Sequence, residues 1–286
     1  MSSMQPAWSW QFASDAIQQL ELLLPEESIT PEWAWGERTG EGVRVAVIDS
    51  GIDDTHPAIG GSVSRQVTLR ETGGEIVFDE TRSGDAYGHG TACAGIIRSI
   101  APGCELISVK VLGANLASSG RAFLAGLKWA MDNGADVCNL SLGTTKSEFY
   151  GKLHEMMDLA YFRRIMIVAA VNNLPVPSFP AVFASVFSVA AHSSGAEQGF
   201  LYNPNPPAEF GAPGIDVRVP WVDGEWITAT GNSFAAPHIT GSIARILSNH
   251  PGLTPFQVKT ILRALATNAA RQPYREQCSS ESHSNT

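Results

Sequence analysis

Three residue types that together can activate a hydroxyl group for attack on a carbonyl occur in order along this chain of 286 residues. Asp49 ends the apolar run VRVAVID, His89 lies between two glycines in DAYGHGTACAG, and Ser233 opens the stretch SFAAPHITG. A serine that attacks a carbonyl needs a base to take its proton, and that base needs a carboxylate to fix its tautomer. The order aspartate, histidine, serine is one of the known orders of such triads. The three motifs together therefore predict acyl-transfer chemistry.

Each of these residues also has an ordinary structural explanation when it is taken alone. A serine at the start of a helix is most often a cap, and a histidine in a glycine-rich turn most often has no chemical role. A buried aspartate without a partner would be costly or would become protonated, so Asp49 requires a nearby donor. A helix that begins at Ser233 would direct free backbone N–H groups toward a developing oxyanion. Pro237 loses one backbone donor, but we expect this to cost little near a helix start.

The elements that must position these residues alternate between strands and helices. Continuous apolar runs, typical of strands buried on both faces of a parallel sheet, occupy 43–50, 105–113, 135–143, 165–173 and 185–193. Helical patterns occupy 90–100, 119–134, 148–164, 233–247 and 254–267. This alternation predicts an α/β fold with a doubly wound, mostly parallel sheet flanked by helices in three layers. Ligands of such sheets bind at the carboxyl ends of the strands, where Asp49, Ser141, Asn172 and Asn173 lie.

Composition and charge argue against several classes of protein. A net charge of −9 and a pI of about 5.2 are atypical of nucleic-acid-binding proteins. The chain has no apolar run of about 18 residues that would predict a membrane helix, and its N-terminus lacks the pattern of a secretory signal. The four cysteines form no CxxC pair, so we expect free thiols rather than a metal site. We therefore expect a cytoplasmic protein without nucleic-acid or membrane partners.

Over roughly residues 31–268 the chain resembles the subtilisin-like serine proteases, or subtilases. The resemblance rests on TGEGVRVAVIDSGI before and around the aspartate, HGTACAG at the histidine, and GNSFAAPH at the serine, close to the family's GTSMAAPH. It implies a subtilisin-like fold and a serine endopeptidase whose triad is Asp49, His89 and Ser233. It also implies that Asn173, in VAAVNN, is the oxyanion-hole asparagine, with neighbouring Asn172 as the alternative position.

The resemblance further implies that an extended peptide substrate pairs as a strand with two segments, VLGANLASSG and SLG. The implied substrate-binding residues are Leu112, Gly113, Ser141, Leu142, Gly143, Ala170, Asn172 and Ser178. The chain departs from the family pattern in three places. Asn172 replaces a glycine, Asn232 replaces a threonine, and only LPVP separates Asn173 from Ser178. These departures favour a narrowed substrate pocket. A specialised processing protease is therefore an alternative to a general degradative protease.

We expect three parts of the chain: an N-terminal extension over 1–30, a peptidase domain over 31–270, and a polar, disordered tail over 271–286. Only 48 residues precede Asp49. This is too few for the large prodomain of secreted relatives, so the resemblance is to intracellular ones. The extension is a candidate to cover the cleft, and the alternative is a segment docked elsewhere on the surface.

Two other functions would use the same residues. Peptide ligation or macrocyclisation passes through the same acyl-enzyme but excludes water, and a non-catalytic peptide-binding module would keep only the fold. We expect no required cofactor and no catalytic metal; a metal site formed by Asp49, His56 and His89 is the best chemistry outside proteolysis. For Asp53 and Asp54, solvent exposure and binding of a structural calcium ion are the open alternatives. The sequence assigns no oligomeric state.

Overall fold

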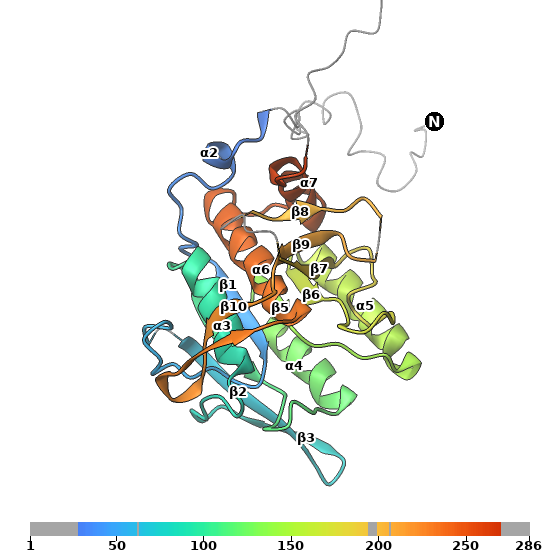
Figure 1. Ribbon diagram of the computed structural model, residues 1–286. Helices are drawn as coiled ribbons and strands as arrows, with labels where there is room; N and C mark the ends of the chain where they lie inside the picture. Colours follow the sequence, from blue (N-terminus) through green and yellow to red (C-terminus); the bar gives the residue numbers. More distant parts are fainter. Residues whose placement is uncertain (1–27, 62, 194–198, 206, 270–286) are drawn as a thin grey trace, which may run out of the picture.

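The computed structural model describes residues 28–269 except 62, 194–198 and 206 (Figure 1). Most of the predicted N-terminal extension and all of the predicted tail therefore lie outside the described residues. Among the helices that the structure describes, none is both long and apolar enough to cross a membrane.

A nine-stranded sheet forms the centre of the described chain, in the order β3-β2-β4-β1-β5-β6-β7-β9-β8. Its strands are β1 Arg44–Asp49, β2 Val63–Thr72, β3 Glu75–Asp79, β4 Glu105–Lys110, β5 Val137–Leu140, β6 Met166–Ala170, β7 Phe187–His192, β8 Leu201–Tyr202 and β9 Phe210–Pro213. Neighbouring strands are parallel except at the two edges, where β2 pairs with β3 and β8 pairs with β9 in antiparallel fashion. The predicted mostly parallel sheet is confirmed.

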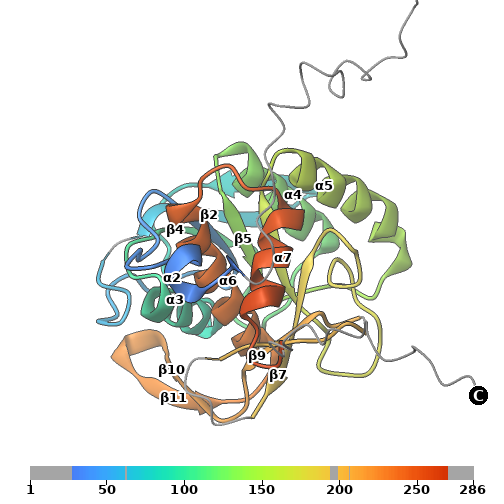
Figure 2. The same ribbon diagram turned by 90° about the horizontal axis from the view of Figure 1, so that it is seen from above.

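Helices cover both faces of this sheet (Figures 1 and 2). They are α2 Pro31–Ala34, α3 His89–Ile100, α4 Gly120–Asp132, α5 Tyr150–Phe162, α6 Asn232–Asn249 and α7 Pro255–Leu265, with short 3-10 helices at Ser147–Phe149 and Val222–Gly224. One buried cluster joins the sheet to α3, α6 and α7, and a second joins its other face to α4 and α5. The three-layer α/β/α arrangement predicted from the sequence is therefore present.

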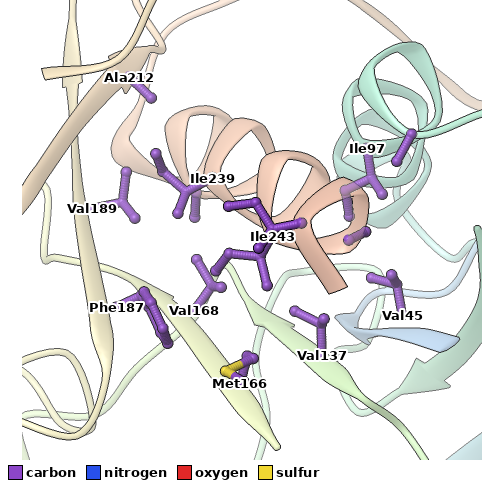
Figure 3. Packing of buried hydrophobic residues seen from close by; sticks show 14 of the residues in the cluster. Val45, Ile97, Val137, Met166, Val168, Phe187, Val189, Ala212, Ile239 and Ile243 are labelled. Carbon is purple, nitrogen blue, oxygen red and sulfur yellow. The ribbon is translucent and has the colours of Figure 1, made fainter. Parts of the chain in front are cut away.

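The apolar runs in the sequence arise because the central strands are buried on both faces. In β1, Val45 and Val47 belong to the cluster on the α6 side, whereas Ala46 and Ile48 belong to the cluster on the α4 side. Burying each of the valine and isoleucine side chains contributes roughly 1.5–3 kcal/mol of transfer free energy. Helix α6 packs on the sheet beside α3, and Figure 3 shows Ile239 and Ile243 packed in this core.

Two hairpins were not predicted from the sequence. β2 and β3 meet at Gly73 and Gly74, whose φ angles of 61° and 83° allow the tight turn. A separate two-stranded sheet is formed by β10 Val217–Pro220 and β11 Trp226–Ala229, which pair in antiparallel fashion. Both hairpins expose much of their surface, so their sequences lack the continuous apolar runs of the central strands.

Candidate active site

Asp49 ends β1 at the carboxyl edge of the sheet, and its side chain is 0% exposed. The backbone N–H of Ser50 donates to Asp49 Oδ1 at 2.7 Å, and His89 Nδ1 lies 2.8 and 2.9 Å from the two carboxylate oxygens. The donors that a buried aspartate requires are therefore supplied by the next residue and by the predicted histidine.

His89 is the first residue of α3, and the loop before it is held by Asp85. Asp85 Oδ1 accepts the backbone N–H groups of Tyr87 and Gly88, both at 2.9 Å. Its Oδ2 accepts from the backbone and hydroxyl of Thr91, at 2.8 and 2.7 Å. The start of α3, and with it the imidazole, is thus fixed by four hydrogen bonds to one carboxylate.

The two glycines around His89 are required by close contacts. Gly88 has a φ of 118°, a left-handed conformation that disfavours other residues. A Cβ on Gly90 would overlap the carbonyl oxygen of Gly51, while the Gly90 N–H donates to Ser50 Oγ at 3.0 Å. The turn that follows β1 therefore packs directly on the first turn of α3, which brings the two motifs together.

Opposing effects determine the pKa of His89. Burial alone would lower it, but the charge of Asp49, the hydrogen bond to Asp49 and the charge of Asp85 together outweigh burial. The pKa of His89 is consequently raised above its ordinary value of 6.5. This environment stabilises the imidazolium that forms when His89 accepts a proton.

Ser233 does not cap α6. The helix begins at Asn232, its N-cap is Gly231, and no side chain caps it. The Asn232 side chain instead binds neighbouring strands: its Oδ1 accepts from Ala191 N at 2.8 Å, and its Nδ2 donates to the carbonyl oxygens of residues 171 and 172. The capping role that explains most serines at a helix start is therefore absent here.

A buried chain of hydrogen bonds lies beneath Ser233. Ser141 Oγ donates to the Ser233 carbonyl at 2.8 Å, and Asn139 Nδ2 donates to Ser141 Oγ at 3.1 Å. Thr240, about two turns further along α6, donates to Asn139 Oδ1 at 2.9 Å. These bonds hold the start of α6 against the carboxyl end of β5.

The structure separates the two adjacent asparagines. Asn173 Oδ1 accepts the backbone N–H of Asn232 at 2.9 Å, which turns its amide toward the start of α6. Asn173 Nδ2 and Ser233 Oγ both lie beside Gly231, at 3.7 and 3.3 Å from the position that a Cβ there would take. Asn172 Oδ1 instead accepts from Leu174 N at 2.9 Å. Asn173 is therefore the asparagine whose amide donor lies near the serine.

A cavity of about 210 Å³ opens beside Ser233. Its lining residues are Ser141, Leu142, Gly143, Ala170, Val171, Asn172, Asn173, Ser178 and Ser233. Six of the eight predicted substrate-binding residues thus come together, and Val171 joins them. Leu112 and Gly113 line a different cavity, of about 320 Å³, that also includes Lys110.

The calcium hypothesis gains no support from Asp53 and Asp54. Asp53 Oδ1 accepts from the backbone and hydroxyl of Thr55, and buried Asp54 bonds Gln66 and Arg82. Among the described residues, the one cluster with metal-ligand spacing is Asp49, His89 and Cys93. The alternative metal site with His56 is not formed, because the His56 ring nitrogens bond Glu225 O and Ala58 N.

Comparison with known proteins agrees with this geometry. Residues 40–280 match the model of the subtilase family. The chain belongs to the subtilases. It is 31% identical over 245 residues to subtilisin DY of Bacillus licheniformis and 32% identical over 241 residues to subtilisin Savinase of Lederbergia lenta. Each alignment covers 80% of this chain and 85% of the relative.

A solved structure shares the fold of this subtilase. The crystal structure of a cold adapted subtilisin-like serine proteinase superposes with a TM-score of 0.65 at 27% identity, covering 78% of this chain and 81% of that one. The subtilase is accordingly a serine-type endopeptidase that acts on peptide or protein substrates.

Proposed function

We propose that this subtilase hydrolyses peptide bonds with Ser233 as nucleophile, His89 as general base and acid, and Asp49 as the group that orients His89. The observation that carries the proposal is the buried pair of Asp49 and His89 at the edge of the sheet where α6 presents Ser233. With Nδ1–H donated to Asp49, His89 Nε2 is the nitrogen that can take a proton.

In the proposed reaction, Ser233 Oγ attacks the peptide carbonyl carbon while its proton passes to His89 Nε2. The π electron pair of the carbonyl moves to oxygen, and Asn173 Nδ2 donates a hydrogen bond to that oxyanion. Collapse of the tetrahedral intermediate breaks the C–N bond, and the imidazolium gives its proton to the leaving amine. Water then attacks the acyl-enzyme by the same steps, which releases the acid and restores Ser233.

The cavity beside Ser233 is proposed to receive the side chain before the scissile bond. Among the described residues that line it, none is charged, and Ser141, Asn172 and Ser178 bring polar groups to it. A small, uncharged cavity favours a limited set of side chains over many. This supports a specialised processing protease, with the flanking substrate backbone paired as a strand.

Two further proposals concern regulation and location. The extension over 1–30 covers the cleft until it is removed, and deletion of residues 1–28 then raises activity; unchanged activity and folding in the deleted chain would refute this. The protein is cytoplasmic: Cys93, Cys104 and Cys138 are free and buried, as in proteins of a reducing compartment. Recovery of the protein only from culture medium in cell fractionation would refute that location.

Intact-mass analysis after reaction with a fluorophosphonate probe tests the mechanism. We expect one adduct on the chain without residues 1–28 and none on the same chain carrying Ser233→Ala. Ser242→Ala is the matched control, because it removes another serine hydroxyl from the same helix and should keep the adduct. An adduct that persists in Ser233→Ala, or no adduct on the chain with or without residues 1–28, would contradict the proposal.

A further inference from the structure

The hairpin of β10 and β11 lies beside α3, the helix that begins at His89 (Figure 2). Two consecutive hairpin residues occupy the space that side chains on α3 or its cap would need. A Cβ on Gly88 would overlap the Trp221 indole, and a Cβ on Gly95, two turns along the helix, would overlap the Pro220 ring. The hairpin therefore rests directly on the backbone of α3 at two points.

Aromatic and aliphatic side chains fill this contact. Ala92, Ile96, Val219 and Phe234 form a buried cluster, and half-buried Trp221 packs against it. The Phe234 ring lies 5.3 Å from the His89 ring, between centroids. Phe234 and the hairpin therefore both pack against the first turns of α3, the helix that carries the His89 imidazole.

The tip of the hairpin is also tied to the segment that follows Asp49. Trp221 N donates to Glu225 O at 2.7 Å, and His56 Nε2 lies 3.0 Å from the same oxygen. Because Ala58 N donates to His56 Nδ1 at 3.0 Å, His56 carries its proton on Nε2 and donates it to Glu225 O. His56 is only 1% exposed, so its ring is held inside the protein while it makes this bond.

We propose that Trp221 is a positioning residue for the reaction. Trp221 fixes Gly88 and thereby the position and orientation of the His89 ring relative to Asp49 and Ser233. The hydrogen bond from His56 to Glu225 O holds the hairpin in place. Trp221 acts through Gly88 and does not contact the reacting atoms. This inference rests on the proposed role of His89 as the base.

A comparison of three variants tests the proposal. Since a displacement of about 1 Å can cost about 100-fold in rate, we expect Trp221→Ala to lower kcat at least about tenfold, with KM changed less than about twofold. Trp221→Phe should recover most of the activity, because a ring still covers Gly88. Trp129→Ala removes another half-buried tryptophan, on α4, and should keep kcat. If Trp221→Ala keeps the wild-type kcat, the proposal is wrong.

A size swap tests the same contact from the helix side. The added methyl of Gly95→Ala overlaps the Pro220 ring and should displace the hairpin, with a fall in kcat. In the double variant Gly95→Ala/Pro220→Ala the overlapping Cγ and Cδ are gone, and the remaining Cβ of residue 220 would lie at 3.6 Å, an ordinary contact. We expect the double variant to recover activity. A double variant no better than Gly95→Ala would overturn the argument.

A readout independent of catalysis separates this inference from the proposed function. In the full chain carrying Ser233→Ala, which prevents self-digestion, NMR can follow the His89 Nδ1 proton that is donated to Asp49. We expect Trp221→Ala to shift or broaden this signal and Trp129→Ala to leave it unchanged. An unchanged signal in Trp221→Ala would refute the positioning role. A chain that does not react with the fluorophosphonate, either with or without residues 1–28, would refute only the proposed mechanism, since the NMR comparison would still decide the positioning role of Trp221.

Discussion

Both carboxylate oxygens of Asp49 lie within hydrogen-bonding distance of His89 Nδ1, at 2.8 and 2.9 Å. The pair is buried, and it joins the last residue of a central strand to the first residue of a helix. This relationship assigns the proton of the neutral imidazole to Nδ1 and makes Nε2 the acceptor. Four predictions follow from this and from the contacts around it.

Replacement of Asp49 by asparagine should keep the shape of the site but lose its charge. The amide can donate to His89 Nδ1 and favour the wrong tautomer, so we expect kcat to fall about 10⁴-fold, as in other triads. Asp53→Asn is the matched control, because an asparagine can still accept from Thr55. Steady-state hydrolysis of a peptide substrate measures both. A loss below tenfold for Asp49→Asn would count against the triad.

Activity should decline as pH falls through the raised pKa of His89, because the base must be neutral to accept a proton. Asp85→Asn removes one of the charges that raise this pKa, so the acid limb of kcat/KM should move to lower pH. The same change weakens the loop before α3 and should lower the melting temperature. The pH dependence of kcat/KM of both chains tests the predicted shift of the acid limb. An acid limb that stays in place or moves to higher pH in Asp85→Asn would contradict the prediction.

Asn173→Ala should lower kcat about 10²–10³-fold, because it removes a donor to the oxyanion. Asn172→Ala removes a neighbouring side chain whose oxygen bonds Leu174 N, and should change kcat far less. Its position in the cavity wall predicts a change in substrate preference instead. Kinetic profiling of both variants on a peptide library measures these effects. The opposite result, a large fall in kcat for Asn172→Ala and a small one for Asn173→Ala, would assign the oxyanion donor to Asn172.

Thr240→Val should lower the free energy of unfolding by about 1–3 kcal/mol, because it leaves the buried Asn139 Oδ1 without its donor. Thr260→Val is the control: its hydroxyl also bonds the carbonyl four residues earlier, but in a more exposed helix, and it should cost under about 0.5 kcal/mol. Urea unfolding measures the difference. Equal losses would show that the chain of bonds beneath Ser233 adds no stability.

The central strands and the five long helices could be predicted from the sequence, because burial on both faces leaves continuous apolar runs and helix packing leaves periodic ones. The meeting of Asp49 with His89 could be predicted as well, since a buried aspartate needs a donor and glycines flank the histidine. The choice of Asn173 over Asn172 could not be made from the residues alone. It depends on which side chain bonds Asn232 N, a contact across 59 positions.

The β10–β11 hairpin and the contacts of its residues could not be predicted from the sequence. Its strands have four residues each, and their side chains alternate between partial burial and exposure. The contact of Trp221 with Gly88 joins distant parts of the chain, so neither residue signals it locally. Likewise, the sequence does not show that Ser233 is not the cap of α6. The structure shows it, because Gly231 occupies the N-cap position.

Ser233, the proposed nucleophile, is carried by a helix that completes the core. Helix α6 packs on the sheet beside α3, and it is synthesised only after residue 231. A chain still emerging from the ribosome has Asp49 and His89 but neither Ser233 nor the segment that fills the space beside them. The proposed triad and the complete core would therefore form in the same step of folding.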